Sequence, residues 1–504
     1  MTLLYLLAWL LGQARTADST VGQRNDKQRG GDMKCSAAAV ALMVVGVSGL
    51  RAQEMPADTK AAVDAAIRQV VEKTGVPSAS VGIVQHGRIV FTQAYGDARL
   101  PVSKGGAELK ATAAMSYPVG SISKQFTATC VLLLQEDGKL TLDDTVSEWF
   151  PKLTRAKEVT LRELLSHTSG YEDYAPQDYT IPLWTKPGDP LKLVEEWAGK
   201  PLDFEPGTQW QYSNTNFVLA ALIVQKASGM AYFDFLEQRV LKPLGLTQAL
   251  NLDTDRTKVE PLGYERHALA PVRPAILEAP GWYFGDASLA MPVAELLKWD
   301  ISIMNQTLLK PASYAEFETA VKLKDGTSTG YGLGVSVLNQ GGHRIIEHSG
   351  EVGGFVAENL VLPDEKVAIA VLTNQEASSA AGEIASVVSK LVVAKSATAV
   401  VTTSKPEETQ LKAIMSGLQD GKINRALCTE DANYYFSKET MEDFASSLKP
   451  LGAVTEVKKQ SESLRGGMTY RSFEVGFAGG DSVTVSTYTM ANGLLEQLLV
   501  EGKN

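Results

Sequence analysis

Cysteine is scarce in this chain. Its 504 residues include only Cys35, Cys130 and Cys428, which are too few and too widely spaced for the disulfide framework of a small secreted scaffold. Cys130 lies inside an apolar run of helical character, which predicts a buried free thiol rather than a redox or catalytic one. We therefore expect no disulfide framework.

An excess of positive charge is also missing. The chain has 48 Lys and Arg against 58 Asp and Glu, a formal net charge of −10, whereas nucleic-acid binding depends on clustered cations that neutralise phosphates. No two histidines stand at metal-ligand spacing with carboxylates nearby. These absences predict no nucleic-acid partner, no metal and no cofactor.

No apolar run reaches the ~20 residues of a membrane-spanning helix. Two shorter apolar stretches occupy residues 3–11 and 37–50. The second follows Lys34 and ends at Leu50-Arg51-Ala52, which is the order of a secretory signal and its cleavage site. We expect cleavage after Ala52 and export to the periplasm or the extracellular space. The alternative is weak membrane association through the N-terminal segment, with residues 3–11 as the anchor.

The part of the chain that follows the expected signal segment, residues 53–504, is longer than one average domain. Residues 396–408 are poor in large apolar side chains and rich in Ala, Thr, Ser and Lys, which indicates a linker. We therefore divide the chain into an N-terminal extension and signal segment (1–52), a main domain (53–395), this linker, and a small C-terminal domain (409–504).

Hydrophobic periodicity gives the main domain an α+β pattern. A helical repeat at residues 57–74 stops at Gly75, and His86-Gly87 joins two alternating strands, 80–85 and 88–95. Residues 112–307 have mainly helical patterns. The later elements are strands at 331–338, 344–348, 355–362 and 367–374 and a helix at 380–393. This order predicts an antiparallel sheet flanked by helices, with a helical subdomain between its halves.

The C-terminal part has a similar mixture on a smaller scale. Residues 407–419 have a helical period. Strands are predicted at 471–477, 482–489 and 494–500, the last two joined by a turn at Asn492-Gly493. A small α+β domain is expected.

The first chemical motif is Gly120-Ser121-Ile122-Ser123-Lys124, directly ahead of the apolar helical run at residues 126–134. Ser121 then stands at a helix N-terminus, with Lys124 one turn away on the same face, where an amine can hold or accept the hydroxyl proton. Alone, this Ser-x-x-Lys spacing is weak evidence, because a serine before a helix is more often a cap.

Two further segments strengthen this evidence for a nucleophilic Ser121. Tyr212-Ser213-Asn214 precedes a helical run, and His348-Ser349-Gly350 ends a strand, before glycines that let a backbone N–H approach a substrate oxygen. In this order the three segments resemble those of the penicillin-recognising serine hydrolases. The Tyr-x-Asn form is similar to the class C β-lactamase-like branch, which includes DD-peptidases and family VIII-type esterases. The resemblance spans residues 57–393, including segments 164–170 and 371–374.

This resemblance implies a β-lactamase/transpeptidase-like fold and a role for each motif residue. Ser121 would be the acylated nucleophile, Lys124 its proton partner and Tyr212 the general base. Asn214 would bind a substrate amide. The backbone N–H groups of Ser121 and Glu351 would form an oxyanion hole.

The third motif, His348-Ser349-Gly350, is expected to line the substrate site, with His348 where β-lactamases carry lysine. An unperturbed imidazole, with a pKa near ~6.5, is mostly neutral at pH 7. A permanent cation for a substrate carboxylate would then be missing, which favours esters or amides over β-lactams and D-alanyl-D-alanine. The alternative is that His348 hydrogen-bonds in a role equivalent to lysine.

Two other segments are open to more than one interpretation. His167 could be a triad base, but its segment has the pattern of a helix end and a turn, so we expect a structural role. The aromatic segment Gly281-Trp282-Tyr283-Phe284-Gly285 either walls the pocket entrance or packs as ordinary core.

The sequence therefore predicts an exported serine hydrolase that acts on a small-molecule or peptide substrate. It would form an acyl-enzyme on Ser121 with esters, amides, D-peptides or β-lactams. The alternative is a non-catalytic or slowly deacylating sensor module that binds β-lactams or peptidoglycan. Two intact proton-transfer motifs favour the enzyme. The natural substrate, the oligomeric state and the role of the C-terminal domain stay open.

Overall fold

The computed structural model describes residues 55–101, 107–393, 406–465, 468–490 and 492–503. The predicted signal segment, its cleavage site and most of the predicted linker lie outside these ranges. Residues 55–393 are called the main segment below, and the described residues from 406 to 503 the C-terminal segment.

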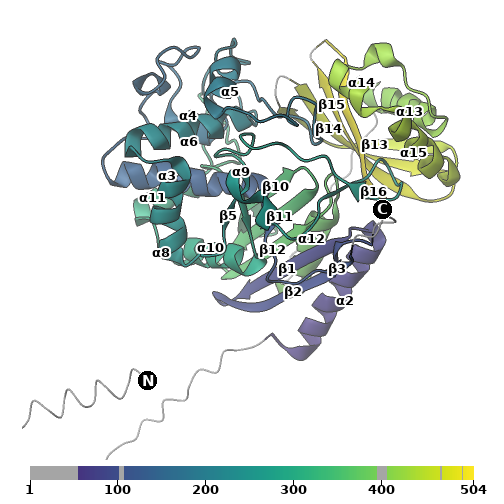
Figure 1. Ribbon diagram of the computed structural model, residues 1–504, viewed down its shortest axis with the longest axis horizontal. Helices are drawn as coiled ribbons and strands as arrows, with labels where there is room; N and C mark the ends of the chain where they lie inside the picture. Colours follow the sequence, from purple (N-terminus) through teal and green to yellow (C-terminus); the bar gives the residue numbers. More distant parts are fainter. Residues whose placement is uncertain (1–54, 102–106, 394–405, 466–467, 491, 504) are drawn as a thin grey trace, which may run out of the picture. The chain divides into compact units, whose positions relative to one another are not determined.

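A seven-stranded antiparallel sheet forms the centre of the main segment (Figure 1). Its strand order is β3-β2-β1-β12-β11-β10-β9, so the first and last long strands of this segment meet in the middle, where Val81 pairs with Val371. The strands are β1 (Ser78–Gln85), β2 (Arg88–Arg99), β3 (Leu109–Lys110), β9 (Ser336–Gln340), β10 (His343–Val352), β11 (Phe355–Leu362) and β12 (Val367–Thr373).

Helices cover both faces of this sheet. Because successive residues of a strand point to opposite faces, Ile369 and Val371 pack under α2 (Ala57–Thr74) and α12 (Ala380–Val392). The other face receives α10 (Val293–Asn305). There a Cβ on Gly82 would lie only 2.6 Å from a methyl group of Leu297. Glycine in β1 thus allows α10 to approach closely.

A helical block joins the two halves of the sheet. Its helices are α3 (Ser123–Glu136), α4 (Leu161–Leu165), α5 (Pro190–Trp197), α6 (Asn214–Ser228), α7 (Tyr232–Leu236), α8 (Lys242–Leu244), α9 (Leu252–Asp255) and α11 (Pro311–Phe317). Its short strands are β4 (Tyr117–Pro118), β5 (Leu250–Asn251), β6 (Tyr264–Glu265), β7 (Arg273–Pro274) and β8 (Leu289–Met291).

Helix α3 is deeply buried in this block. Every residue from 123 to 134 is buried, and the helix ends at Glu136, two residues before Gly138 adopts a φ of 68°. Phe126 stacks on Trp299 of α10 with ring centroids 4.3 Å apart. The position of α3 is therefore set by packing along nearly its whole length.

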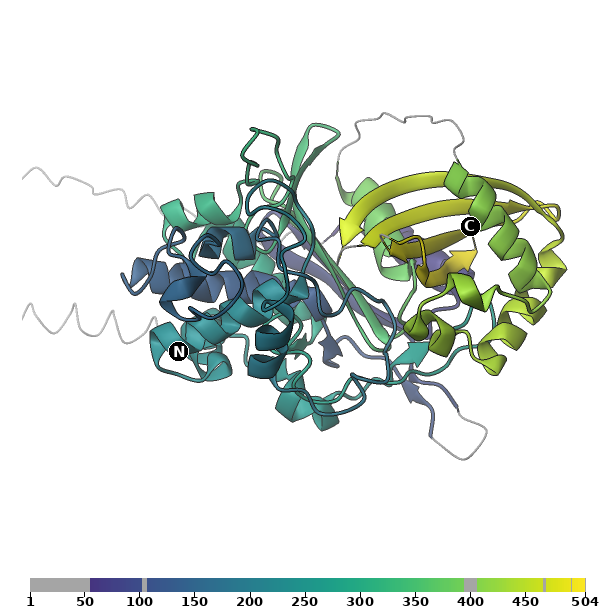
Figure 2. The ribbon, with the colours of Figure 1, turned by 90° about the horizontal axis from the view of Figure 1, so that it is seen from above.

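The C-terminal segment has its own four-stranded antiparallel sheet and its own hydrophobic core (Figure 2). The strands are β13 (Val454–Arg465), β14 (Met468–Phe477), β15 (Ser482–Met490) and β16 (Leu495–Lys503). The helices are α13 (Pro406–Gln419), α14 (Glu430–Tyr435) and α15 (Lys438–Leu448). Leu418, Phe444 and Val475 are completely buried in the core that helices and sheet share.

Most predicted elements are confirmed, including the α+β class, the helix at 57–74 and the hairpin at His86-Gly87, whose residues have φ values of 51° and 70°. The strand predicted for 331–338 is wrong over its first half. Gly334 has a φ of 76°, and the Gly332 N–H donates to the Val335 carbonyl, so the chain turns there and β9 begins at Ser336.

Two predictions for the C-terminal part need correction. The linker, predicted for 396–408, does not extend to residue 408, because α13 begins at Pro406, where proline lacks only an N–H that the first turn leaves unpaired anyway. The prediction also missed β13, α14 and α15. The division of residues 53–504 into two domains stays a prediction.

No single helix among the described residues has the length and apolar character of a membrane span. Only a sharply bent pair, residues 214–228 with 232–244, meets both criteria together.

A buried polar network links α3 to the sheet. The Trp299 indole N–H donates to the Gln125 amide oxygen at 2.8 Å, and the Gln125 amide donates to Asn359 of β11 at 3.2 Å. Asn359 in turn donates to one oxygen of Asp300 at 2.9 Å. Burial raises the pKa of the Asp300 carboxyl well above its ordinary value, although the bond from Asn359 opposes this.

This raised pKa predicts a pH-dependent stability difference between the protein and its Asp300→Asn variant. A carboxyl that binds its proton more tightly when folded contributes stability below its unfolded pKa, and this contribution is lost as pH rises towards the folded pKa. The amide cannot ionise, so the stability of the variant relative to wild type should increase from pH 5 to pH 9, by at most ~1.4 kcal/mol per pH unit. Urea denaturation checks this, with the exposed Asp143→Asn as control. A difference that does not change with pH would contradict it.

Candidate active site

Ser121 lies on a single 3-10 turn, residues 120–122, that leads into α3. Two glycines let this turn touch β10. Gly120 has a φ of 52°, and a Cβ on it would lie 2.5 Å from the Glu351 nitrogen. A Cβ on Gly350 would overlap the Val119 carbonyl and lie 2.9 Å from the Ser121 nitrogen. The two N–H groups predicted to form an oxyanion hole are therefore on adjoining backbones.

Lys124 is completely buried beneath the serine. Its ammonium nitrogen donates to Ser121 Oγ at 2.8 Å, to Asn214 Oδ1 at 2.7 Å and to the Asp286 carbonyl at 3.1 Å. Three acceptors use all three hydrogens of an ammonium. In this arrangement Lys124 is a donor that orients the serine oxygen.

Tyr212 stands just ahead of α6, among aromatic and cationic groups. Its ring centroid is 5.0 Å from the Lys124 nitrogen, 4.2 Å from the centroid of His167 and 6.1 Å from that of His348. The structure thus brings together three motif residues that are separated by many positions in the sequence.

His348 is buried and makes two hydrogen bonds within the protein. Its Nδ1–H donates to the Ser349 carbonyl at 2.5 Å, since a carbonyl can only accept, and its Nε2 then accepts from the Tyr331 hydroxyl at 2.8 Å. Burial, followed by the charge of Lys124, lowers the pKa of His348 to about 4. At pH 7 this side chain offers neither a positive charge nor a free N–H.

His167 supports the backbone next to Tyr212. It is completely buried, has a φ of 59°, and accepts at Nδ1 from the Ser213 N–H at 3.1 Å. Burial, followed by the charge of Lys124, lowers its pKa well below the ordinary value. A neutral ring that accepts a backbone hydrogen bond agrees with the structural role predicted for it.

A cavity of about 290 Å³ opens beside Ser121. Seven of the eight predicted site residues line it, and Lys124 lies behind Ser121. The seven are Ser121, Tyr212, Asn214, His348, Ser349, Gly350 and Glu351. Trp282 and Tyr283 of the predicted aromatic segment also line the cavity, whereas Phe284 packs against Tyr232. Part of the aromatic segment therefore walls the cavity, and part of it packs within the protein.

Carboxyl groups are a feature that sequence reasoning missed, since of the residues that carry them only Glu351 was predicted, and that for its backbone N–H. Those lining the cavity belong to Asp178, Glu278, Asp286, Glu351 and Glu376. Burial raises the pKa of Asp286 to about 7, against the opposing charge of Lys124, and raises those of Glu351 and Glu376 well above their ordinary values. These residues are scattered along the chain, so no local pattern could have grouped them.

Arg465, at the end of β13, was missed as well. It lines the same cavity although it comes from the C-terminal segment. Its only sequence signal is a lone arginine before Gly466-Gly467 in a polar stretch. Among the described residues, no cluster of three or more His, Cys, Asp or Glu side chains could hold a metal ion.

Residues 63–392 match the family model described as Beta-lactamase. The chain belongs to this family. This confirms the family resemblance and, together with the solved structures below, the β-lactamase/transpeptidase-like fold.

Curated relatives include two kinds of protein. Penicillin-binding protein 4* of Bacillus subtilis is 31% identical over 277 residues, which cover 52% of this chain and 61% of that protein. D-aminopeptidase of Brucella anthropi is 24% identical over 418 residues, which cover 80% of this chain and 76% of that protein. The match to the first thus spans less than two thirds of that relative.

Solved structures show the same fold. A D-stereospecific amidohydrolase from Streptomyces aligns with a TM-score of 0.54 at 28% identity, covering 64% of this chain and 96% of that one. The octameric penicillin-binding protein homologue from Pyrococcus abyssi aligns with a TM-score of 0.56 over 88% of this chain and all of that one. At 20% identity the second match shows the fold alone.

The geometry of His167 predicts that it is not a catalytic base. His167→Asn keeps a side-chain oxygen that can accept from the Ser213 N–H. The kcat of this variant for an activated ester should fall by about ten-fold at most, through loosened packing against Tyr212. Loss of a true triad base would instead lower kcat by about 10⁴-fold or more. Steady-state kinetics check this, and a loss of the larger size would make His167 the base.

Proposed function

We propose that this protein is a serine hydrolase that forms an acyl-enzyme on Ser121. The observation that carries the proposal is the 2.8 Å hydrogen bond from the buried Lys124 ammonium to Ser121 Oγ, at the wall of a cavity. A serine oxygen that accepts from a fixed ammonium is held in one orientation, and its own proton is free to leave.

The proton acceptor in this mechanism is Tyr212. Lys124 already donates all three hydrogens, so Tyr212 is the motif residue left to take the proton as Ser121 Oγ attacks the carbonyl carbon. The N–H groups of Ser121 and Glu351 stabilise the developing oxyanion. Tyr212 then passes the proton to the leaving amine or alcohol, and water, deprotonated at the same group, releases the acyl product.

The charges around the cavity support a substrate with a free ammonium group. His348 is neutral, and Arg465 already pairs with Asp173 and Asp178. Among the described residues that line the cavity, no cation is therefore left for a substrate carboxylate. An ammonium that arrives beside Glu351 and Glu376, whose pKa values burial raises, would instead favour the ionised form of these carboxyls, which strengthens its binding.

The wall of the cavity also offers apolar area. Its aromatic side chains are those of Tyr174, Tyr179, Trp184, Tyr212, Trp282 and Tyr283. Such rings accommodate an apolar side chain and favour a nearby cation over their faces. The names of relatives, D-aminopeptidase and D-stereospecific amidohydrolase, support the same choice. We therefore propose small amides and esters of D-amino acids as substrates, in preference to β-lactams.

The test is hydrolysis of D-phenylalanine p-nitroanilide by the full chain. Ser121→Ala should lose all turnover above background, because loss of such a nucleophile costs about 10⁶-fold in kcat. N-acetylation of the substrate removes its positive charge and should lower kcat/KM by about ten-fold or more, since it removes an ion pair in a site of low dielectric. The L-enantiomer is the matched control for stereochemistry.

The outcomes separate the alternatives. Turnover that survives Ser121→Ala would overturn the assignment of the nucleophile. Preference for the N-acetylated compound would overturn the proposed substrate class. Covalent labelling of Ser121 by a fluorescent penicillin without turnover of any substrate would favour the sensor module.

Export is a further part of the proposal. Its support is the signal-like order of residues 34–52. We expect the mature protein to begin at Gln53, which mass spectrometry of the protein from a fractionated bacterial host would check. An intact N-terminus on protein in the cytoplasmic fraction would contradict this expectation.

A further inference from the structure

Strand β13 reaches from the C-terminal segment to the catalytic motif. Its last residue, Arg465, forms a parallel β-bridge with Tyr212, so the two backbones are hydrogen-bonded to each other. The guanidinium carbon lies 5.2 Å from the centroid of the Tyr212 ring. A residue of the second sheet thus contacts the proposed proton acceptor through both backbone and side chain.

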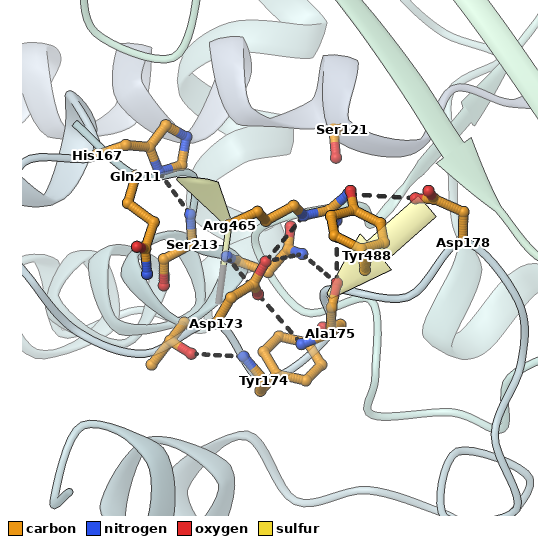
Figure 3. Close-up of polar contacts among 12 residues, drawn as sticks. Ser121, His167, Asp173, Tyr174, Ala175, Asp178, Gln211, Ser213, Arg465 and Tyr488 are labelled. Carbon is orange, nitrogen blue, oxygen red and sulfur yellow. Dashed lines mark hydrogen bonds and ion pairs between the residues drawn. The ribbon is translucent and has the colours of Figure 1, made fainter. Parts of the chain in front are cut away.

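The guanidinium group is held in a fixed orientation (Figure 3). Its Nε donates to Asp173 at 3.2 Å, and one terminal nitrogen donates to Asp178 at 3.2 Å and to the Tyr488 hydroxyl at 2.9 Å. The other terminal nitrogen donates to the Ala175 carbonyl at 3.0 Å. Four of the five N–H groups are therefore used, and the side chain is only 21% exposed.

Asp173 carries this contact on to the lysine. Its side chain is completely buried, and it accepts from the Asn214 backbone N–H at 2.9 Å and from the Asn214 amide at 3.4 Å. The oxygen of the same amide accepts from Lys124. A continuous chain of contacts therefore runs from Arg465 through Asp173 and Asn214 to Lys124. A buried carboxylate needs a cationic partner, and Arg465 supplies it.

The groups around the Tyr212 ring include two cations and several neutral rings. Lys124 and Arg465 are the two cations beside it. Burial lowers the pKa values of His167 and His348, so both rings are neutral, and burial raises the pKa of the nearby Tyr331 well above its ordinary value. The carboxylates of Asp173 and Asp178 are turned to Arg465.

A second link holds the cavity wall that contains Asp178. Gln497 of β16 accepts from the Asp178 backbone N–H at 2.7 Å and donates to its carboxylate at 2.9 Å. The Tyr179 hydroxyl donates to the Glu496 carbonyl at 3.1 Å. The anion that orients Arg465 is therefore itself positioned by the C-terminal sheet.

We infer that Arg465 is a positioning residue through which the C-terminal segment completes the active site: it is bridged to Tyr212, places its positive charge beside the Tyr212 ring, and fixes Asn214 by way of Asp173. This inference rests on the proposed function, in which Tyr212 accepts the proton of Ser121. Arg465 itself acts through Tyr212 and Asn214, and it does not contact the reacting atoms.

The experiment compares Arg465→Met with Arg471→Met in the full chain. Arg471 is the matched control, because it lies on the adjacent strand β14, pairs with Glu462 at 2.8 Å and does not line the cavity. The pH profile of kcat/KM for D-phenylalanine p-nitroanilide is recorded for both variants, for wild type and for Ser121→Ala. Circular dichroism and the urea midpoint report on folding.

For Arg465→Met we expect kcat to fall about ten-fold or more, because a residue that acts through a general base forfeits part of the 10²–10⁴ that such a base contributes. The acidic limb of the profile should move up by about one pH unit, since a cation near a phenol favours its anion. Millimolar methylguanidinium should restore part of the rate. Arg471→Met should match wild type in all three respects.

If the acidic limb of the pH profile lies at the same pH in Arg465→Met as in wild type, the inference is overturned, even if kcat falls. A purely structural loss lowers the rate without moving the limb. If Arg465→Met does not fold, the same comparison of acidic limbs is made with Arg465→Gln, which keeps polar contacts but not the charge. Wild-type turnover that is abolished by Ser121→Ala but unaffected by loss of Arg465 would overturn this inference alone. Absence of Ser121-dependent turnover in wild type would overturn the proposed function and the inference with it.

Discussion

The site depends on one buried ammonium. Lys124 is removed from water, and its partners are a hydroxyl oxygen, an amide oxygen and a carbonyl oxygen, all uncharged. Burying a charge is costly unless hydrogen bonds satisfy it completely. Three different parts of the chain must therefore supply an acceptor at the same point: the turn before α3, the start of α6, and the loop at Asp286. The depth of α3 in the core helps to meet this demand, since a shallower helix would let water compete for the ammonium.

Burial also explains why so many neighbouring groups favour their neutral forms. A protonated His348 beside Lys124 and Arg465 would be a third cation in a poorly hydrated space, and burial together with Lys124 lowers its pKa to about 4. The carboxyls of Asp286, Glu351 and Glu376 respond in the opposite sense, because burial raises their pKa values. The cavity thus holds carboxyl groups whose ionisation a bound cation would favour. A lysine in place of His348 would bring a permanent cation instead and invert that preference.

Sequence reasoning succeeded where the signal is local. Ser121 and Lys124 are one helical turn apart, and the apolar run after them contains no Gly or Pro, so motif and helix could be predicted together. Strands such as β11 and β12 have an unbroken apolar or alternating pattern and were predicted within one residue.

The failures of the sequence predictions share a physical cause. β13 is an edge strand whose residues from 458 to 464 are nearly all exposed, so it lacks the alternation by which strands are recognised. Arg465 and the carboxyls of the cavity are brought together only by tertiary packing.

The polar character of β13 also accounts for its contact with the site. An edge strand presents unpaired N–H and C=O groups, which ordinarily invite pairing with another chain. Here the end of that edge pairs within the same chain, where Arg465 bridges to Tyr212. An apolar β13 would have belonged to the core of its own sheet and could not have carried an arginine into a cavity. The feature that hid this strand from sequence reasoning is therefore the one that lets it contact the catalytic motif. The Tyr212 ring lies beside the Arg465 guanidinium of the C-terminal segment and packs against His167 of the main segment, so two segments with separate hydrophobic cores contact it.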